Sequence, residues 1–158
     1  MALPPYTVDR VIQNGLDIVH RVPHPYYSMD WDKRLGPNAY DCSGFMGVIN
    51  GIPGGPATPA MVDIYKTYGY IHLKFTGLSN LKKGDVLVYN KPGTSGFGAA
   101  GHTAMYAGNS MFLECHGGYG PDYLLWHGDG YWQDVLRNPR SGIYITHWTP
   151  TDGLGGGF

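Results

Sequence analysis

The sequence of 158 residues predicts an α+β fold in which N-terminal helices pack on a small antiparallel sheet. Apolar residues recur at helical spacing only in the first half of the chain, and short alternating apolar runs bounded by Gly, Asn and Pro fill the second half. Helices followed by strands are typical of α+β domains. A chain of this length forms one domain that buries roughly 70% of the surface of its unfolded state.

Three helices are expected in the first half of the chain. The first follows Thr7, a suitable N-cap, and ends before Pro23. A short second helix follows Asp41 and is broken by the stretch NGIPGGP. The third fits TPAMVDIYKTYG, in which Thr58 caps the helix, a proline takes the first helical position, and Gly69 ends the run.

The remaining segments predict an ordered loop, strands and a tail. The stretch PHPYYSMDWDKRLGPNAY is rich in aromatic and turn residues and is expected to be an ordered loop. The runs GDVLVYN, HTAMYAGN, MFLECH and GIYITHW are expected to be strands of one antiparallel sheet. The final TPTDGLGGGF has the composition of a flexible linker. We therefore expect a domain over residues 1–149 and a Gly-rich linker or tail over residues 150–158.

The composition of the chain limits the classes of function that we expect for it. A formal net charge of -1 without a basic stripe argues against binding nucleic acid. Thirteen Tyr, four Trp and 25 Gly suit a loop-rich domain that recognises a sugar or a peptide. No run approaches the ~18 apolar residues of a membrane helix. The start MALPPYTVDR lacks a basic segment followed by an apolar run, so no secretory signal is expected and the chain is predicted to be made in the cytoplasm.

The stretch YDCSGF places a cysteine at a predicted helix start. Asp41 can accept a backbone N–H of the first turn, and the free N–H groups of that turn favour a thiolate at Cys42. Gly44 is expected to leave room for a substrate or a neighbouring strand, and Ser43 adds a polar group. The alternative is that Cys42 is a small buried core residue.

A histidine that can serve this thiol opens the run HTAMYAGN. The Gly, Asn and Ser that follow predict a three-residue hairpin turn, which pairs position 107 with 111 and puts the even-numbered residues on one face. His102, Glu114 and His116 share that face, and either of the last two can orient the imidazole, Glu114 as an acceptor of Nδ1–H. The alternative is a half-buried strand histidine bonded to backbone, with Glu114 solvated.

Two other site types are less favoured. GFGAAG matches the dinucleotide pattern G-x-G-x-x-G, but a strand rather than a helix follows it, so we interpret it as a mobile loop at the rim of a cleft. Cys42, His102, Glu114 and His116 could gather around zinc, but neither C-x-x-C nor H-E-x-x-H spacing is present. We expect no metal and no cofactor. The tryptophans suit either glycan stacking or the core.

Four stretches occur in a characteristic order: YDCSGF, LKKGDVLVYN, GHTAMYAGN and FLECHGG. They resemble the successive signatures of the NlpC-type cell-wall peptidase superfamily, which has a papain-like fold. YSMDWDKRLGPNAYDCS, KKGDVLVYN and AAGHT are most similar to the phage lysin amidases of that superfamily. The resemblance covers roughly residues 25 to 120, and the residues after Tyr123 match no pattern.

The resemblance implies roles for individual residues. Cys42 corresponds to the nucleophile and His102 to the general base. The third polar residue of the family lies twelve positions after that histidine, at Glu114, where the family most often has His or Asn. Tyr27 resembles a site tyrosine near the nucleophile, although a different alignment places Tyr26 there. Substrate contacts are expected from Tyr27 and from the neighbours of the nucleophile, Asp41 and Ser43.

The resemblance also implies a function. It predicts a phage endolysin that cleaves the amide between N-acetylmuramic acid and L-alanine of bacterial peptidoglycan with a cysteine nucleophile. One alternative is a stem-peptide endopeptidase of the same fold that cuts after D-glutamate. Another is a non-catalytic wall-binding or tail-associated module. We expect a monomer with no nucleic-acid or membrane partner, which a pore in the host membrane releases to the wall.

Overall fold

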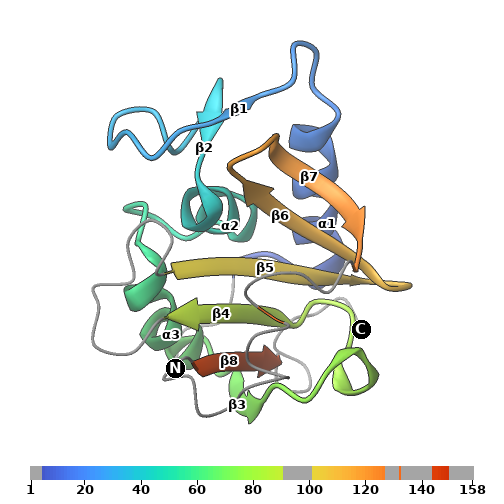
Figure 1. Ribbon diagram of the computed structural model, residues 1–158. Helices are drawn as coiled ribbons and strands as arrows, with labels where there is room; N and C mark the ends of the chain where they lie inside the picture. Colours follow the sequence, from blue (N-terminus) through green and yellow to red (C-terminus); the bar gives the residue numbers. More distant parts are fainter. Residues whose placement is uncertain (1–4, 91–100, 127–131, 133–143, 150–158) are drawn as a thin grey trace.

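The computed structural model describes residues 5–90, 101–126, 132 and 144–149 (Figure 1). These residues form helices and a mainly antiparallel sheet, so the predicted α+β class is confirmed. The helices are α1 (Val8–Val19), α2 (Cys42–Asn50), α3 (Thr58–Thr67) and the short 3-10 helix η1 (Leu78–Asn80). The strands are β1 (Tyr26–Tyr27), β2 (Ala39–Tyr40), β3 (Ile71–Lys74), β4 (Val86–Asn90), β5 (Gly101–Gly108), β6 (Met111–His116), β7 (Gly120–Leu125) and β8 (Tyr144–Thr149).

The main sheet has six strands in the order β3-β8-β4-β5-β6-β7, and every neighbouring pair is antiparallel. The four predicted strands are β4, β5, β6 and β8. The sequence missed β3 and β7, and it missed the two-residue strands β1 and β2, which pair in parallel within the expected loop. β8 comes last in the chain but lies between β3 and β4.

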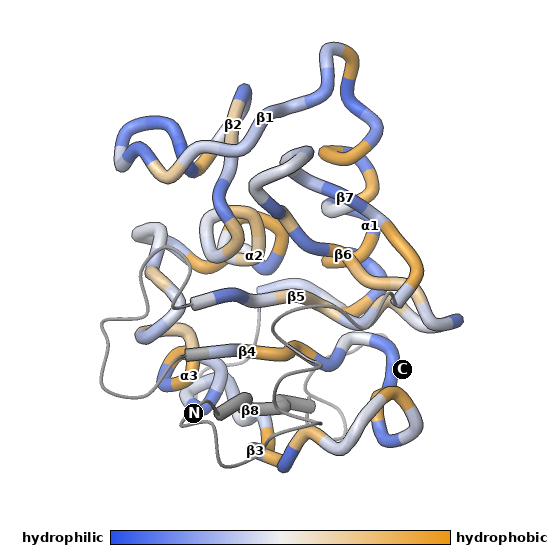
Figure 2. The backbone as a smooth tube through the Cα atoms, in the orientation of Figure 1, coloured by the Kyte–Doolittle hydropathy of each residue, from blue (hydrophilic) through white to orange (hydrophobic). Residues whose placement is uncertain are grey.

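Apolar side chains cover both faces of the sheet. One cluster joins the buried faces of α1, α2 and α3 to odd-numbered sheet residues such as Met105, Leu113 and Cys115, and to the even-numbered Val86 and Val88 of β4. A second cluster on the opposite face includes Leu87, Tyr89, Ala104, Phe112 and Trp132. Figure 2 shows hydrophobic colouring concentrated in α2 and β4, with the loop between β1 and β2 largely hydrophilic.

Two of the three predicted helix caps are present. The Thr7 hydroxyl accepts the N–H of Arg10 at 3.2 Å, and Asp41 caps α2. The prediction for α3 is wrong, because Ala57 is the N-cap residue and makes no side-chain cap. Thr58 lies within the helix, where it is buried with its hydroxyl directed at Cys42 rather than at the backbone.

The β5–β6 hairpin differs from the prediction by one residue. The turn has two residues, Asn109 and Ser110, whose φ angles of 53° and 62° are those of a type I′ turn. The three-residue turn is therefore wrong, and a register shift between Tyr106 and Gly108 absorbs the difference. Ala104 still pairs with Glu114, so the even-numbered residues share a face as expected.

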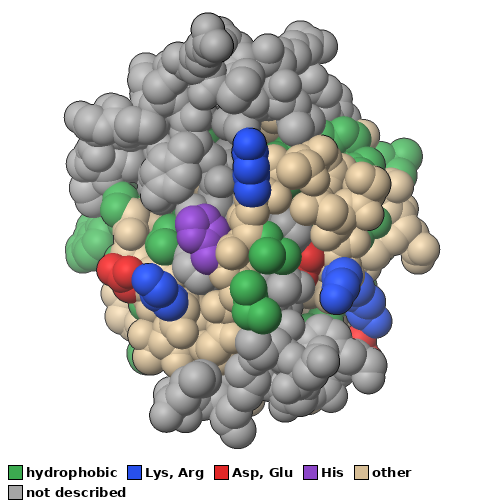
Figure 3. Space-filling model, turned by 90° about the horizontal axis from the view of Figure 1, so that it is seen from below, with side chains coloured by type: hydrophobic (Ala, Val, Ile, Leu, Met, Phe, Trp, Pro, Cys, Tyr) green, Lys and Arg blue, Asp and Glu red, His purple; other side chains and the backbone are tan. Residues whose placement is uncertain are grey.

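Figure 3 views the molecule from below, and the described Lys and Arg side chains on this face are scattered rather than gathered into a continuous patch. None of the helices in the described segments combines the length and apolar character needed to span a bilayer. The expected Gly-rich loop at residues 96–100 and the tail at residues 150–158 lie outside the described residues.

Candidate active site

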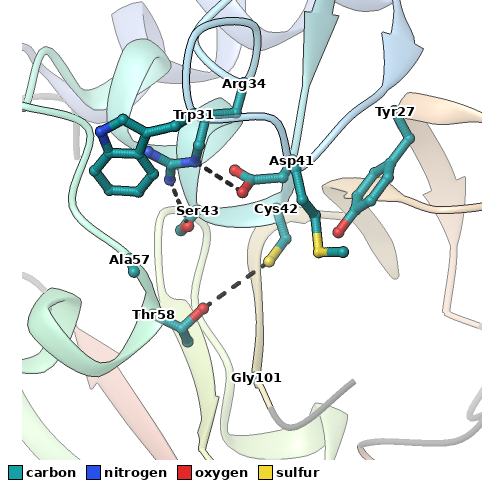
Figure 4. A pocket seen from close by; sticks show the side chains of 10 residues that line it. Tyr27, Trp31, Arg34, Asp41, Cys42, Ser43, Ala57, Thr58 and Gly101 are labelled. Carbon is teal, nitrogen blue, oxygen red and sulfur yellow. Dashed lines mark hydrogen bonds and ion pairs between the residues drawn. The ribbon is translucent and has the colours of Figure 1, made fainter. Parts of the chain in front are cut away.

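The first turn of α2 positions the Cys42 sulfur. Asp41 Oδ1 accepts the N–H of Gly44 at 2.7 Å, which fixes the cap, and Cys42 is the first residue of the helix. The thiol is 8% exposed and lies on a cavity of about 270 Å³. Figure 4 shows its sulfur directed toward Thr58, whose Oγ1 lies 4.0 Å from Sγ.

Gly44 does not make room for a substrate, as the sequence suggested. A Cβ at this position would overlap the carbonyl oxygen of Arg34 and would lie 2.7 Å from Asp41 Oδ1. The chain itself fills the space beside the first turn. A glycine is needed here because the helix start packs directly on the Arg34 backbone.

Arg34 is a site residue that the sequence did not reveal. Its side chain is 2% exposed and donates to four acceptors around the helix start. Nε reaches Asp41 Oδ2 and Nη2 reaches Ser43 Oγ, both at 2.8 Å. Nη1 donates to the carbonyl of Gly55 at 2.5 Å, and Nη2 also donates to that of Pro56 at 3.3 Å. The guanidinium thus ties α2 to the loop that leads into α3.

The contacts of Arg34 also determine which way the residues predicted to contact the substrate face. Tyr27, Asp41 and Ser43 all line the cavity. Asp41 Oδ2 and Ser43 Oγ accept from Arg34, and Asp41 Oδ1 accepts from the N–H of Gly44, so these atoms face the protein rather than open space. Of the two candidate tyrosines the cavity contains Tyr27, whereas Tyr26 is 52% exposed and is absent from the described lining.

His102 and Glu114 meet on the sheet. The Nε2 atom of His102 lies 2.6 Å from Glu114 Oε2, and both side chains are buried, at 7% and 6% exposure. Glu114 pairs with Ala104 across the ladder, so it lies diagonal to His102 on the same face. The predicted bond used Nδ1, which is wrong. The Trp132 ring, 3% exposed, packs on the imidazole with 5.7 Å between ring centroids.

The thiol also affects the protonation of the imidazole. Burial alone lowers the pKa of His102, but hydrogen bonds with the Cys42 and Glu114 side chains and the charges of these two groups outweigh it. The pKa of His102 is raised from 6.5 to about 10 as a result. The ring therefore retains its proton at neutral pH between two partners.

His116, the other residue considered for orienting His102, has a different partner. Its Nε2 lies 2.9 Å from Asp122 Oδ2 on β7. Glu114 is therefore the described carboxylate that contacts His102. The part of the chain that the structure describes contains no group of three or more His, Cys, Asp or Glu that could hold a metal ion.

The tryptophans separate into different environments that the sequence left open. Trp31 is 70% exposed on the cavity wall, whereas Trp132 is buried beside His102. Trp126 is partly buried and packs on Phe112 with 5.3 Å between centroids. The side chain of Trp148 lies outside the described part. No sequence pattern distinguishes these residues, because burial depends on the tertiary packing around each one.

Replacing Glu114 with Gln is expected to move the alkaline limit of activity to lower pH and to reduce the rate at pH 7 by roughly 10²-fold. Because folding raises the pKa of His102, its contribution to stability is fully present below the unfolded pKa of 6.5 and is lost as pH rises through about 10. Removing the carboxylate is expected to lower the pKa of His102 in the folded protein, and with it the pH at which this stability is lost. The rate of wall hydrolysis and the free energy of urea unfolding, both measured from pH 5 to 11, test these two expectations.

The matched control is Asp122→Asn, which removes the carboxylate of the other histidine pair on the same hairpin. This variant should keep the parental alkaline limit. If Glu114→Gln and Asp122→Asn gave the same pH profile, Glu114 would have no effect on the protonation of His102.

Comparisons with known proteins identify the family and the fold of the chain. The model of a family described as bacteriophage peptidoglycan hydrolase matches residues 19–122. NlpC2 from Trichomonas vaginalis superposes with a TM-score of 0.51 at 15% identity, covering 94% of this chain and 49% of that one. An NlpC/P60 family protein from Bacillus cereus superposes with a TM-score of 0.54 at 18% identity, covering 91% of this chain and 40% of that one.

The chain therefore spans about half or less of the length of these solved structures. At such identities the likeness establishes the fold, which is the NlpC-type, papain-like fold that the sequence resemblance implied. A comparison with curated proteins found no match.

Proposed function

The chain belongs to the bacteriophage peptidoglycan hydrolase family, and on this premise we propose that it is a cysteine-dependent hydrolase of peptidoglycan amide bonds. The observation that carries the proposal is the buried His102–Glu114 pair, which lies directly after Gly101, a residue that lines the same cavity as Cys42. A nucleophile, a base that contacts it and a group that orients the base are the parts that covalent amide hydrolysis requires.

The proposed reaction begins with the proton on His102. The raised pKa of His102 favours the imidazolium, and in the proposed step the Cys42 sulfur attacks the amide carbonyl as a thiolate. His102 then donates its proton to the departing nitrogen, and the acyl group remains on sulfur. Water attacks the thioester with His102 taking its proton, the C–S bond breaks, and the acid is released, which restores the Cys42 thiolate and the His102 imidazolium. Glu114 holds the ring in place through both steps.

The start of α2 supplies groups for the developing oxyanion. The first N–H groups of a helix have no acceptor within the helix. Gly44 N–H is bonded to Asp41 Oδ1 and Phe45 N–H to the Asp41 carbonyl, so the N–H groups of Cys42 and Ser43 are the first-turn donors next to the reacting sulfur. Removing one such donor typically costs ~10²–10³ in rate. Tyr27, Asp41 and Ser43 form the wall against which the substrate lies.

We assign the scissile bond to the amide between N-acetylmuramic acid and L-alanine. The support is the similarity of YSMDWDKRLGPNAYDCS and AAGHT to phage lysin amidases, together with the family match. The proposal includes a catalytic domain at residues 1–149 and a linker or tail at residues 150–158. It also includes action on the cell wall as a monomer after release from the host.

Mass spectrometry of purified cell walls digested with the protein tests the bond. An amidase releases stem peptides with a new amino group on L-alanine and leaves glycan chains without peptide. New amino groups at a residue after D-glutamate, with L-alanine still blocked, would assign a stem-peptide endopeptidase instead. Walls that bind the protein but release no amine would identify a wall-binding module. Digests with and without EDTA distinguish thiol chemistry from metal chemistry.

A further inference from the structure

The described lining of the cavity that holds Cys42 includes the exposed ring of Trp31, and its two charged side chains, Arg34 and Asp41, are paired with each other. Trp31 is 70% exposed and lines this cavity, although an indole of that size is rarely left open to water on a loop. The guanidinium carbon of Arg34 lies 5.0 Å from the centre of the Trp31 ring, a cation–π contact. The buried Arg34 thus supports one face of the indole, while the ring stays largely exposed.

The charged side chains of this cavity wall already form hydrogen bonds within the protein. Arg34 donates to Asp41, Ser43 and two backbone carbonyls, and Asp41 accepts both from Arg34 and from the N–H of Gly44. A substrate carboxylate would therefore find no unpaired guanidinium here. What the wall offers is a flat, supported apolar surface.

We propose that Trp31 is the floor of a sugar subsite that binds the pyranose ring of the N-acetylmuramoyl residue. The inference rests on the proposed function, since that amide joins a sugar to a peptide, so one of the two must lie on each side of Cys42. A pyranose presents a face of C–H groups that packs on an indole, whereas the stem peptide carries carboxylates. The stem peptide lies on the opposite side, where Figure 4 shows Tyr27.

The size of the cavity agrees with one sugar unit. Its volume of about 270 Å³ is below the roughly 300–1,000 Å³ of pockets that enclose a whole drug-sized ligand. The site therefore takes one unit of a polymer at a time. The sugar that adjoins the scissile bond is the unit that Trp31 is placed to hold.

Binding to the Cys42→Ala protein tests the subsite without turnover. Titration calorimetry with peptide-free glycan chains should show an affinity about 10- to 30-fold weaker when Trp31→Ala is added, and Trp31→Phe should restore part of it. The free stem peptide should bind equally to both proteins. With Cys42 present, Trp31→Ala should raise KM for muramoyl peptides by a similar factor with kcat within threefold.

Two controls separate the possible outcomes. Tyr26→Ala removes another exposed aromatic side chain, outside the described cavity lining, and should leave glycan affinity unchanged. The rate at which iodoacetamide labels Cys42 should be the same in Trp31→Ala and the parent, which shows that the site is intact. The subsite is wrong if glycan affinity is unaffected or if only stem-peptide affinity falls. Failure of the proposed function appears separately, as hydrolysis that survives Cys42→Ala.

Discussion

Replacing Cys42 with alanine is expected to lower the rate of wall hydrolysis by about 10⁴- to 10⁶-fold, because Cys42 is the proposed nucleophile and its side chain lines the cavity. The protein should still fold, since the hydrogen-bonding contact recorded for the thiol among the described residues is the long one of 4.0 Å to Thr58. Clearing of dye-labelled walls measures the loss, and circular dichroism with thermal unfolding measures the fold.

The second cysteine provides the matched control. Cys115 is fully buried and donates to the Tyr40 carbonyl at 3.2 Å, and burial raises the pKa of its thiol. Cys115→Ala should cost about 1 kcal/mol of stability and keep the parental rate of hydrolysis. Iodoacetamide at pH 7 should label Cys42 and leave Cys115 unmodified. If Cys42→Ala clears walls as fast as Cys115→Ala does, the thiol mechanism is wrong.

Replacing Arg34 with methionine is expected to lower the free energy of unfolding by about 3–5 kcal/mol. The change leaves the Asp41 carboxylate, 13% exposed, without its partner, and it leaves the carbonyls of Gly55 and Pro56 without donors. Arg34→Lys keeps the charge but cannot reproduce the fork of donors, so it should lose part of this amount. Urea unfolding at pH 7 measures both variants.

Arg21 is the control for this change. It also donates to two acceptors, the Pro37 carbonyl and the Tyr40 hydroxyl, but it lies at the surface. Arg21→Met should cost no more than about 1 kcal/mol. Adding Asp41→Asn to Arg34→Met should recover part of the loss, because no charge is then left unpaired. Equal urea midpoints for Arg34→Met and Arg21→Met would show that the buried guanidinium does not fasten α2.

The features that the sequence predicted correctly depend on neighbours in the chain. The Asp41 cap is a contact across three residues, and the start of α2 follows from it. The hairpin joins β5 to β6 directly, so the even-numbered residues were expected on one face, and His102 and Glu114 lie together there. One residue of error in the turn did not matter, because a register shift in β5 compensated for it.

The features that the sequence missed join distant segments. Arg34 lies in a polar, turn-rich stretch that is typical of a solvated loop, yet it is buried by contacts to carbonyls 21 and 22 residues away. Thr58 has the sequence pattern of a helix cap, but its hydroxyl faces Cys42, 16 residues earlier. Neither contact leaves a periodic signal. Tertiary packing alone decides whether such a side chain is buried.

The position of β8 in the sheet has a consequence for how the protein is made. As a chain leaves the ribosome, β3 and β4 emerge well before the strand that separates them, since β8 contributes the ladder partners of both. Until residues 144–149 appear, the edge of β4 has unpaired backbone groups, which are a template for aggregation. The nascent chain would thus complete its sheet, and support the strand next to His102, only after residues 144–149 have emerged.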